Sequence, residues 1–312
     1  MKKRVHHWID ANLLNLEGKT ALVTGATNGL GLEVSRLLVR QGARVIMGCR
    51  SREKGDLRRA EVQSSCPGGP VETVMLDLAD LASIQRCSDA LHDRLQSLDI
   101  LINNAGIMAV PYHRTVDGFE LQLGTNHWGH FALTGRLWDL VCAAPEARVI
   151  TVSSIAHRMG AVDFTDLQWE KKYLAWPAYG RSKLANLLFA YELQRKCEER
   201  SLPVLSCAVH PGWAATDLQQ VAPRLEGNKG KEMIIGLANH LLAQHPIMGA
   251  LPALYAAAAP TITGGACIGP GGAFQLRGFP RRVSSNRRSH DRALAQRLWE
   301  VSQQLTGVRF PD

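Results

Sequence analysis

Short apolar runs rich in β-branched residues alternate with longer helical stretches through the first two-thirds of the chain. This alternation predicts a parallel sheet covered by helices on both faces. The predicted strands are Thr20 to Thr24, Ala43 to Cys49, Val71 to Asp77, Ile100 to Asn103, Arg148 to Ser153, Val204 to Val209, and a seventh near Ala266 to Ile268. The predicted helices lie at roughly 30 to 41, 53 to 65, 81 to 97, 117 to 143 and 178 to 200. We therefore expect an α/β fold with a doubly wound, seven-stranded parallel sheet.

No stretch is long enough or rich enough in Pro and Ser to be a linker between domains, so we expect a single domain. It covers residues 18–275, after an N-terminal extension at 1–17 and before a basic C-terminal tail at 276–312. The alternation is interrupted at about 213–250, where we expect a substrate-binding loop.

Apolar residues recur at helical spacing in the C-terminal tail, and this pattern predicts one more helix. Ser289 is the expected N-cap of this helix and Gly307 its stop. Its apolar face, which we expect to dock on the domain, is formed by Leu294, Leu298, Val301 and Leu305.

The basic start Met1-Lys2-Lys3-Arg4 resembles the beginning of a signal peptide, but polar residues interrupt the next segment before a long apolar stretch develops. Residues 5–16 are expected to pack on the domain or fray, with a short interfacial helix as the alternative. No segment has the ~20 uninterrupted apolar residues that a spanning helix needs. The seven cysteines form no C-x-x-C pair, which indicates reduced cytosolic thiols. We expect a cytoplasmic protein, with peripheral membrane association as the alternative.

The net charge of +8 raises the question of a nucleic-acid partner. Much of the excess lies in two arginine-rich clusters, and aromatic residues do not interleave with the arginines as a base-stacking surface requires. With 46% hydrophobic and 21% charged residues, the composition is that of an ordinary globular protein. We therefore expect no nucleic-acid partner and look for a small-molecule site.

A glycine-rich string, Thr24-Gly25-Ala26-Thr27-Asn28-Gly29-Leu30-Gly31, follows the first predicted strand and opens the first predicted helix. Glycines allow the backbone to turn sharply and approach a pyrophosphate, and the amides and dipole at a helix start attract its charge. This string predicts a dinucleotide site, with a plain strand-to-helix turn as the alternative.

The second predicted strand ends at Cys49-Arg50, where an NAD-selective protein usually places an acidic residue that binds the adenosine ribose. No Asp or Glu occurs from Val34 through Arg52, and Arg50, Arg52 and Lys54 occupy this region instead. A guanidinium can bind a 2′-phosphate with two hydrogen bonds, which favours NADP(H) over NAD(H). The alternative is a solvated basic face at the start of a helix.

Two further strand ends carry candidate cofactor contacts. Asp77, in Leu76-Asp77-Leu78, can accept a hydrogen bond from an adenine amino group or cap the next turn. In Asn103-Asn104-Ala105-Gly106 the polar side chains can fix the edge of the sheet while the small residues leave room for a ribose; a bare turn is the alternative.

Tyr179 and Lys183 are four residues apart, and hence on one face of a predicted helix. A neighbouring positive charge favours a phenolate, so Lys183 can lower the pKa of Tyr179 and suit it to acid–base catalysis. Taken alone, the pair is equally typical of an exposed helix surface, which is the alternative. Ser154 follows the fifth strand and Asn126 lies in the helix before that strand. Because strand carboxyl ends meet at one edge of such a sheet, we expect these residues to converge there.

Taken in order, these motifs and the Pro211-Gly212 after the sixth strand resemble the short-chain dehydrogenase/reductase family, from about Gly18 to Gly272. The details Gly48-Cys49-Arg50 and His127-Trp128-Gly129-His130-Phe131 are most similar to its retinol-dehydrogenase-like branch. The resemblance implies a Rossmann fold and hydride transfer between a nicotinamide and a carbonyl or alcohol.

The resemblance also implies residue roles. Tyr179 exchanges a proton with the substrate oxygen, Lys183 holds the nicotinamide ribose, Ser154 hydrogen-bonds the carbonyl or alcohol, and Asn126 positions a water that links Lys183 to solvent. The residues expected to bind the cofactor are Thr24, Gly25, Thr27, Asn28, Gly29, Leu30, Gly31, Arg50, Arg52, Lys54, Asp77, Leu78, Asn104, Ala105, Gly106, Tyr179, Lys183, Pro211, Gly212 and Thr216.

The substrate is expected to be lipophilic, such as a retinoid, steroid or polyketide-like compound, because two variable segments are apolar. Their candidate lining residues are Phe164, Trp169, Tyr173 and Trp176 in the first segment, and Met233, Ile234, Ile235, Leu237, Leu241 and Leu242 in the second. Ordinary core or a subunit interface is the alternative.

Other functions stay open on the sequence alone. A dinucleotide sensor without turnover and a relative that catalyses epimerisation or dehydration are the alternatives to an oxidoreductase. His127 and His130 have the spacing of a metal-binding pair, but no third ligand is evident, so we expect them to be packed and no metal to bind. A homodimer or tetramer through the helices at 117–143 and 178–200 is usual in the family, although the loop and the tail could block either surface.

Overall fold

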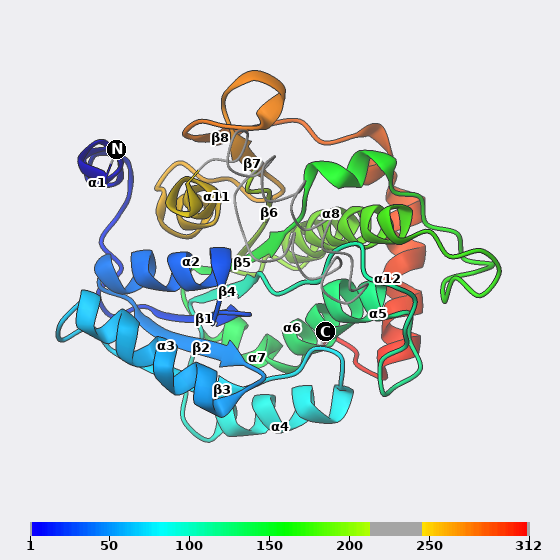
Figure 1. Ribbon diagram of the computed structural model, residues 1–312, viewed down its shortest axis with the longest axis horizontal. Helices are drawn as coiled ribbons and strands as arrows, with labels where there is room; N and C mark the ends of the chain where they lie inside the picture. Colours follow the sequence, from blue (N-terminus) through cyan, green and yellow to red (C-terminus); the bar gives the residue numbers. More distant parts are fainter. Residues whose placement is uncertain (1, 213–244, 311–312) are drawn as a thin grey trace, which may run out of the picture.

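The computed structural model describes residues 2–212 and 245–310 of the chain (Figure 1). Its centre is an eight-stranded sheet with the order β3-β2-β1-β4-β5-β6-β7-β8. The strands are β1 Thr20–Thr24, β2 Arg44–Cys49, β3 Val71–Met75, β4 Ile100–Asn103, β5 Ala147–Val152, β6 Val204–Val209, β7 Cys267–Pro270 and β8 Pro280–Arg282. Neighbouring strands from β3 to β7 run parallel, which confirms the doubly wound α/β fold.

The predicted strand count of seven is wrong by one, because β8 pairs antiparallel with β7. The sequence Pro280-Arg281-Arg282 is short and polar and has no alternating apolar pattern, so it gave no strand signal. A proline is tolerated there because β8 is at the edge of the sheet.

Helices cover both faces of the sheet. They are α1 Lys2–Asn12, α2 Gly29–Arg40, α3 Arg52–Ser65, α4 Leu81–His92, α5 Leu121–Leu123, α6 Gly129–Arg136, α7 Trp138–Cys142, α8 Ala175–Glu199, α11 Pro246–Ala258 and α12 Arg292–Thr306. Alternate residues of one strand face opposite layers: Ala21 and Val23 pack in the core that contains α2 and α11, whereas Leu22 packs in the core that contains α4, α6 and α8. Strands buried on both faces explain the nearly continuous apolar runs in the sequence.

The helix predicted over 117–143 is interrupted in the structure. Residues before Leu121 form a turn, with Gly118 at a φ of 85° and a bridge between Arg114 and Glu120. The Glu120 carboxylate then accepts hydrogen bonds from the amides of Gln122 and Leu123, which starts α5. A π-helical turn, η1 Gly124–Trp128, separates α5 from α6. Such turns are rare and are often found at functional sites.

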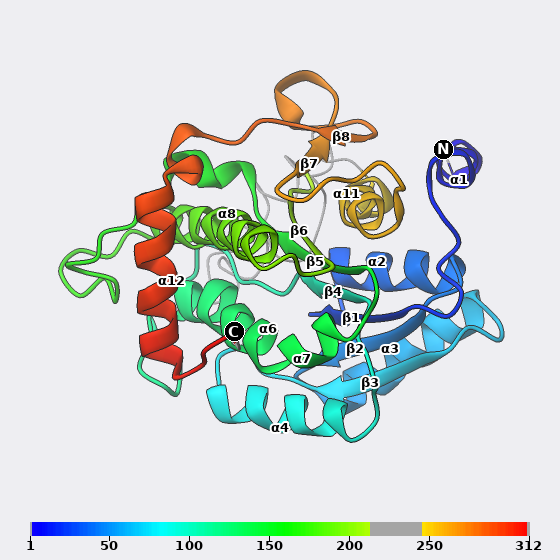
Figure 2. The ribbon, with the colours of Figure 1, turned by 180° about the vertical axis from the view of Figure 1, so that it is seen from behind.

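The C-terminal residues wrap around the helical layer of α6 and α8, where α12 packs (Figure 2). The N-cap of α12 is Asp291, whose side chain accepts a hydrogen bond from the amide of Leu294. The predicted N-cap Ser289 instead lies in the preceding 3-10 turn. Gly307 ends the helix with a φ of 66°, as the sequence predicted.

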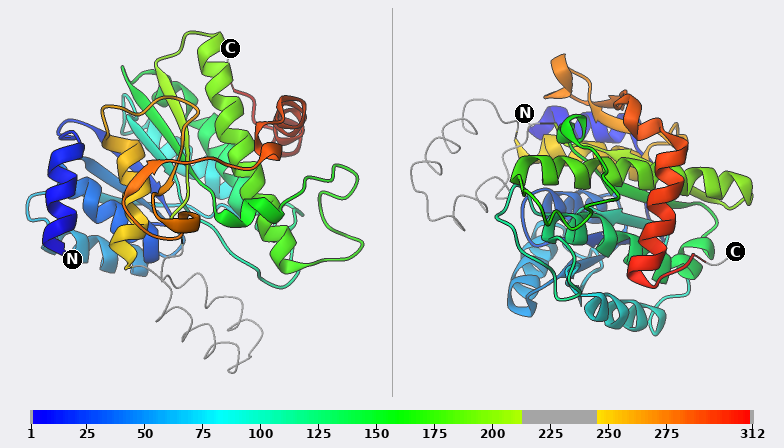
Figure 3. Two further views of the ribbon diagram at one scale, coloured as in Figure 1. Left: turned by 90° about the horizontal axis from the view of Figure 1, so that it is seen from above. Right: turned by 90° about the vertical axis from the view of Figure 1, so that its right-hand side faces the viewer.

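Helix α1 packs on the domain through Val5 and Ile9, which are 1% and 2% exposed. Trp8 stacks on Phe279 with the ring centroids 5.2 Å apart, and its centroid is 5.8 Å from that of Tyr255 in α11. The ribbon shows α1, at the N-terminus, beside α11 (Figure 3). The structure therefore has the packed form of the N-terminal extension. Within residues 2–212 and 245–310 there is no helix with the length and apolar character needed to cross a membrane.

Candidate active site

Four side chains from three segments meet beyond the carboxyl ends of β4 and β5. Tyr179 and Lys183 lie one turn apart in α8, and Ser154 is the N-cap of a 3-10 turn, η2 Ile155–Met159, directly after β5. Asn126 lies in the π-helical turn η1. The structure thus brings together all four residues to which the sequence gave a catalytic role.

The phenol of Tyr179 is buried and shares a hydrogen bond with Ser154. Burial raises the pKa of Tyr179 to about 12, and the hydrogen bond from Ser154 works against this rise. This direction is opposite to the one expected from a cationic neighbour. The reason is geometric, because the Lys183 ammonium lies 5.7 Å from the centroid of the Tyr179 ring and burial disfavours the phenolate. At neutral pH the tyrosine is a proton donor.

The Lys183 ammonium is enclosed, with 3% of the residue exposed, and it donates to the Val152 carbonyl at 3.0 Å. Burial lowers the pKa of Lys183 to about 8. The neighbouring Ser153 hydroxyl donates to the Lys183 carbonyl at 2.8 Å. Ser153 therefore fixes α8 against β5, while Ser154 contacts the phenol.

Asn126 is held by two backbone bonds to one residue: its Oδ1 accepts from the Ile107 amide at 2.8 Å and its Nδ2 donates to the Ile107 carbonyl at 2.9 Å. Nδ2 also donates to the hydroxyl of Ser182 at 2.9 Å. Ser182 was not singled out in the sequence, although it directly precedes Lys183. The sequence did contain a signal for Ser182, since a serine on the buried face of a helix needs a hydrogen-bond partner.

Glycine is required in the glycine-rich loop between β1 and α2, because this loop lies against the segment that follows β4. Gly25 has a φ of 64°, and a Cβ there would lie 2.9 Å from the Cα of Ala105. A Cβ on Gly31 would lie 2.4 Å from the Gly25 carbonyl oxygen. Gly29, which begins α2, also has a positive φ of 52°.

The start of α2 suits a pyrophosphate. Asn28 is the N-cap of this helix, yet its side chain makes no capping hydrogen bond, so the first amides are not occupied by it. Thr27, Gly29 and Leu30 are partly exposed beside it. Exposed amides at a helix start are the donors that a diphosphate needs. The residues present therefore fit a dinucleotide.

The basic residues near β2 divide into two sets. Arg44, Arg58 and Arg59 are each ion-paired, with Glu72, Glu61 and Asp56 respectively. By contrast, the exposed Arg50, Arg52 and Lys54 form no ion pair with any residue in the described part of the chain. Arg50 lies just before α3, and Arg52 and Lys54 lie in its first turn. Ser51 is the N-cap of this helix, and its hydroxyl accepts a hydrogen bond from the Lys54 amide.

At the third strand end, Asp77 caps a turn, since its Oδ1 accepts from the Ala79 amide at 3.0 Å. Leu78 is buried in the core, and its carbonyl oxygen lies against Gly129, where a Cβ would come within 2.3 Å. These contacts leave a partly exposed Asp77 carboxylate at the sheet edge and no exposed Leu78 side chain.

The fourth strand end is fixed by Thr24. The Asn104 side chain donates to the Thr24 carbonyl at 2.8 Å, and the amides of Asn104 and Ala105 both donate to its hydroxyl at 2.9 Å. A Cβ on Gly106 would lie 3.1 Å from Asn126 Oδ1 and 3.4 Å from Lys183 Nζ. The loop Asn104–Gly106 therefore lies directly against Asn126 and Lys183.

After β6, the described chain ends in a tight turn at Pro211 and Gly212. Gly212 has a φ of 68°, and a Cβ there would lie 2.4 Å from the Leu276 carbonyl oxygen. Thr216 lies outside the described residues, as do the candidate lining residues from Met233 to Leu242 and most of the predicted substrate loop.

Of the four aromatic candidates in the first variable segment, one is exposed beside the site. Trp176 is 51% exposed and its ring centroid lies 6.2 Å from that of Tyr179. Met159 (54% exposed) and Leu174 (49%) are also open to solvent, and the Met159 side chain lies against Gly180. We call these three exposed apolar residues the apolar rim: Trp176 and Met159 lie beside Tyr179 and Gly180, and Leu174 precedes the first turn of α8.

The other three aromatic candidates hold their own segment in place. Phe164 packs beside α12 under the guanidinium of Arg297, 4.2 Å from its ring centroid. The indole of Trp169 lies under the guanidinium of Arg181, 3.9 Å from the centroid. The Tyr173 hydroxyl donates to the Val110 carbonyl at 2.8 Å.

The three histidines near the site have structural partners. His127 bonds Ser302 of α12, and His157 donates to the Ser154 carbonyl at 2.6 Å and accepts from the Asn286 amide. Burial lowers the pKa of both His127 and His130 to about 3. In the described ranges no three His, Cys, Asp or Glu side chains come together as a metal site requires.

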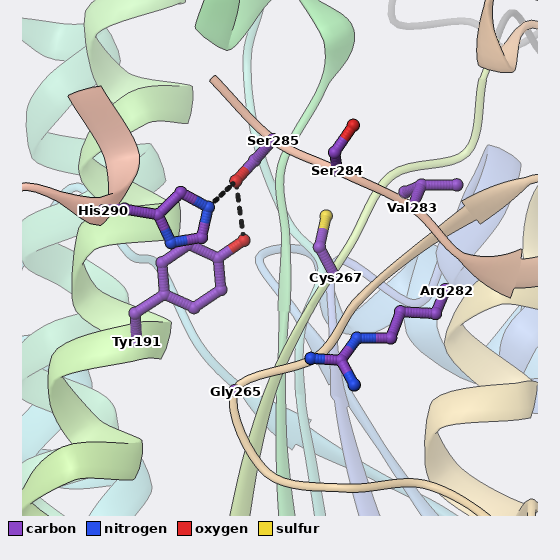
Figure 4. A pocket seen from close by; sticks show the side chains of 8 residues that line it. All are labelled: Tyr191, Gly265, Cys267, Arg282, Val283, Ser284, Ser285 and His290. Carbon is purple, nitrogen blue, oxygen red and sulfur yellow. Dashed lines mark hydrogen bonds between the residues drawn. The ribbon is translucent and has the colours of Figure 1, made fainter. Parts of the chain in front are cut away.

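A separate cavity of about 330 Å³ opens farther along α8, between this helix and the segment after β8 (Figure 4). Its lining residues are Tyr191, Gly265, Cys267, Arg282, Val283, Ser284, Ser285 and His290. Ser285 Oγ lies 2.9 Å from His290 Nε2, but it also bonds Tyr191 and lies 2.7 Å from Ser289 Oγ. Ser289 donates its own proton to the Asn286 carbonyl, so it accepts from Ser285. Ser285 is therefore not a nucleophile activated by His290.

Comparison with known proteins agrees with this geometry. A family profile described as short chain dehydrogenase matches residues 19–226. Human retinol dehydrogenase 13 is 36% identical over 298 residues, which cover 95% of this chain and 87% of that protein. Human retinol dehydrogenase 11 is 40% identical over 218 residues, covering 70% of this chain and 68% of that protein.

Solved structures give the same result for the fold. An uncharacterized protein from Mycobacterium paratuberculosis superimposes with a TM-score of 0.79 and 40% identity, over 97% of this chain and 98% of that one. RhlG of Pseudomonas aeruginosa, solved as a complex with NADP, gives a TM-score of 0.65 at 24% identity, over 84% of this chain and 98% of that one.

Proposed function

The chain belongs to the short-chain dehydrogenase family, in its retinol-dehydrogenase-like branch, and we propose that it is an NADP(H)-dependent reductase or dehydrogenase of a lipophilic carbonyl or alcohol. An oxidoreductase acting on CH–OH or C=O groups follows from the family. The choice of cofactor and the lipophilic substrate are the proposal. The observation that carries it is the exposed apolar rim next to a buried, protonated Tyr179.

We assign the chemistry to the four converging side chains. A bound nicotinamide cofactor supplies or accepts the hydride. In the reductive direction the Tyr179 phenol donates its proton to the substrate oxygen, and Ser154 donates a hydrogen bond to the same oxygen. Positioned donors of this kind stabilise the negative charge that develops on that oxygen.

Lys183 and Asn126 support the proton donor. The Lys183 ammonium faces Gly106 and Val152, which is the position from which it can hold a ribose hydroxyl. Asn126 keeps Ile107 and Ser182 fixed next to it. We propose that a water held near Asn126 replaces the proton that passes from Lys183 to Tyr179.

The preference for NADP(H) is supported by the three cations without ion-pair partners in the described chain, Arg50, Arg52 and Lys54. A guanidinium in solvent gains most from a phosphate when no carboxylate already occupies it. Asp77 and the Asn104 loop are the proposed contacts of the adenine and ribose. The turn at Pro211 and Gly212, followed by Thr216, is proposed to close over the nicotinamide.

The lipophilic substrate is supported by the apolar rim. Trp176, Met159 and Leu174 expose large apolar side chains close to the proposed proton donor, where they would favour an apolar substrate over a polar one. The retinol dehydrogenases among the relatives carry the name of a lipophilic alcohol, which agrees with this proposal.

Cofactor absorbance tests the proposal. NADPH and NADH are each mixed with a series of aldehydes and ketones from short-chain to retinoid- and steroid-sized compounds, and NADP⁺ with the matching alcohols. We expect turnover with NADPH that improves with the apolar size of the substrate. Equal or better turnover with NADH contradicts the cofactor choice, and the best turnover with small polar carbonyls contradicts the substrate class.

Self-association and location remain predictions. Helix α12 packs on α6 and α8, so a dimer through these helices would have to displace it or use another surface. Light scattering after gel filtration measures the assembly. Fractionation of cells into cytosol and membranes tests the proposed cytoplasmic location.

A further inference from the structure

A buried histidine connects the π-helical turn that carries Asn126 with Thr24 at the end of β1. His130 Nδ1 lies 2.9 Å from the Asn126 carbonyl oxygen, and its Nε2 lies 2.9 Å from Thr24 Oγ1. His130 is 1% exposed, and Asn126 and Thr24 are fully buried. The three residues come from α6, η1 and the end of β1.

The partners of His130 fix where its proton is. A carbonyl oxygen can only accept, so Nδ1 carries the hydrogen and donates it to Asn126. The ring is neutral, since burial lowers the pKa of His130 to about 3, and Nε2 is therefore an acceptor. Thr24 must then donate its hydroxyl hydrogen to Nε2.

The Thr24 hydroxyl is used completely by this arrangement. Its oxygen accepts from the amides of Asn104 and Ala105, and its one hydrogen goes to His130 at 2.9 Å rather than to the Ile102 carbonyl at 3.3 Å. All donors point the same way, from the loop at Asn104 and Ala105 through Thr24 and His130 to Asn126. Hydrogen bonds aligned in this way strengthen one another in a buried site.

His127 provides an internal comparison. It is also 1% exposed and lies in the same helical segment, and burial likewise lowers its pKa to about 3. Its Nε2 bonds the Ser302 hydroxyl of α12 at 3.1 Å, and therefore points to the C-terminal tail rather than to Thr24. The two histidines share burial and neutrality but differ in what they connect.

We infer that His130 is a positioning residue of the proposed reaction, which holds the turn of Asn126 with one ring nitrogen and Thr24, with the loop Asn104–Gly106 bonded to it, with the other. The Nδ1 side holds the turn that carries Asn126, and the Nε2 side holds Thr24 and, through it, Asn104 and Ala105. The inference rests on the proposed oxidoreductase activity. It adds a division of labour, because loss of one bond affects turnover and loss of the other affects cofactor binding.

Two conservative substitutions separate the two sides. The shorter amide of His130→Asn can replace Nδ1, and so keep the Asn126 bond while losing the bond to Thr24. The longer amide of His130→Gln can replace Nε2, and so keep the Thr24 bond while losing the bond to Asn126. His127→Asn is the matched control, because it removes the Ser302 bond at an equally buried position.

The three readouts are the NADPH dissociation constant by fluorescence, kcat with a saturating carbonyl, and the melting temperature. His130→Asn should weaken NADPH binding by about tenfold and lower kcat much less, whereas His130→Gln should lower kcat by about tenfold and weaken NADPH binding much less, as expected when one buried hydrogen bond is lost. His127→Asn should lower the melting temperature alone.

The inference is overturned if both His130 variants lower only the melting temperature, as the control does, or if the two variants change NADPH binding and kcat by the same factors. The two proposals fail in different ways. If the wild-type protein reduces no carbonyl, the proposed function is wrong, whereas the effect of His130→Asn on NADPH binding is still measured without turnover.

Discussion

Around Arg50 the positive charges stand in solvent without carboxylate partners in the described chain, whereas at Lys183 the positive charge is enclosed and bonded to a backbone carbonyl. Solvent and salt screen the cations around Arg50, so each of them contributes a moderate and independent part of the binding free energy of a ligand. Burial controls the second group, because it lowers the pKa of Lys183 and raises that of Tyr179. Under the proposed function, the exposed charges select the cofactor, and the buried charge determines the protonation of the catalytic group.

The strongest test of this contrast is Tyr179→Phe. It removes the buried proton donor and leaves the exposed cations unchanged, so we expect a loss of ~10² to 10⁴ in kcat, the usual contribution of general acid catalysis. NADPH affinity should stay near the wild-type value, as measured by fluorescence titration. A variant that retains full turnover would contradict the role of the phenol.

The next largest effect should come from the exposed end. Arg50→Ser together with Arg52→Ser should weaken NADPH binding by roughly 10 to 100-fold, as expected for charge-assisted hydrogen bonds, and leave NADH binding unchanged. The loss should shrink as salt is raised. Arg58→Ser is the control, since Arg58 is already paired with Glu61. Equal losses for both cofactors would argue against a 2′-phosphate site.

The buried end should also respond to pH. The pKa of Lys183 is lowered to about 8, so the charged form, which we propose to hold the ribose, is lost as pH rises through that value. We expect kcat/KM for reduction to fall about tenfold per pH unit above pH 8, as for loss of a single proton. Salt should change this profile little, because the group is enclosed. A profile that is flat from pH 7 to 10 would contradict the assignment.

Burial of Lys183 has a stability cost with a definite sign. Its folded pKa lies below the unfolded value, so the free energy of unfolding rises with pH between about 8 and 10.5. Lys183→Met should remove this rise and gain about 1–3 kcal/mol at pH 7, since replacing a buried charge by an apolar side chain is often stabilising. Denaturant titrations at pH 7 and pH 10 measure both values.

The smallest effect is expected at the apolar rim. Trp176→Ala should raise KM for a retinoid- or steroid-sized carbonyl by about tenfold, in line with the loss of about 1.5–3 kcal/mol of apolar burial at most. KM for a short-chain aldehyde and the NADPH affinity should not change. Leu57→Ala, which removes an exposed apolar side chain of α3, serves as the control.

Much of the fold followed from the sequence because β1, β2 and β4 are buried on both faces and so carry continuous apolar runs. The order of motifs also placed Ser154, Tyr179 and Lys183 at one edge. The interruption before Leu121 did not follow, because it depends on a side-chain cap by Glu120 whose partners are backbone amides. The eighth strand depends on pairing with β7, which no local pattern encodes.

The sequence predicted which residues would meet at the site, but it did not predict the direction in which the pKa of Tyr179 shifts. The spacing of Tyr179 and Lys183 suggested a lowered tyrosine pKa, and only the structure shows that burial dominates at 5.7 Å. His130 was considered as a metal ligand because its spacing from His127 was visible. Its partner Thr24 lies 106 residues away in the sequence, so the contact that gives it a role could not be derived from spacing.

Helix α12 and the residues after it bring Trp299 and Phe310 onto Phe131 and Phe189, with centroids 5.1 to 6.4 Å apart. A nascent chain therefore carries an open aromatic surface on α6 and α8 until residues 292–310 have left the ribosome. Apolar surface that is exposed in this way during translation is prone to aggregation. Premature stop codons before α12 should consequently yield insoluble products, even though the entire catalytic group has already been made.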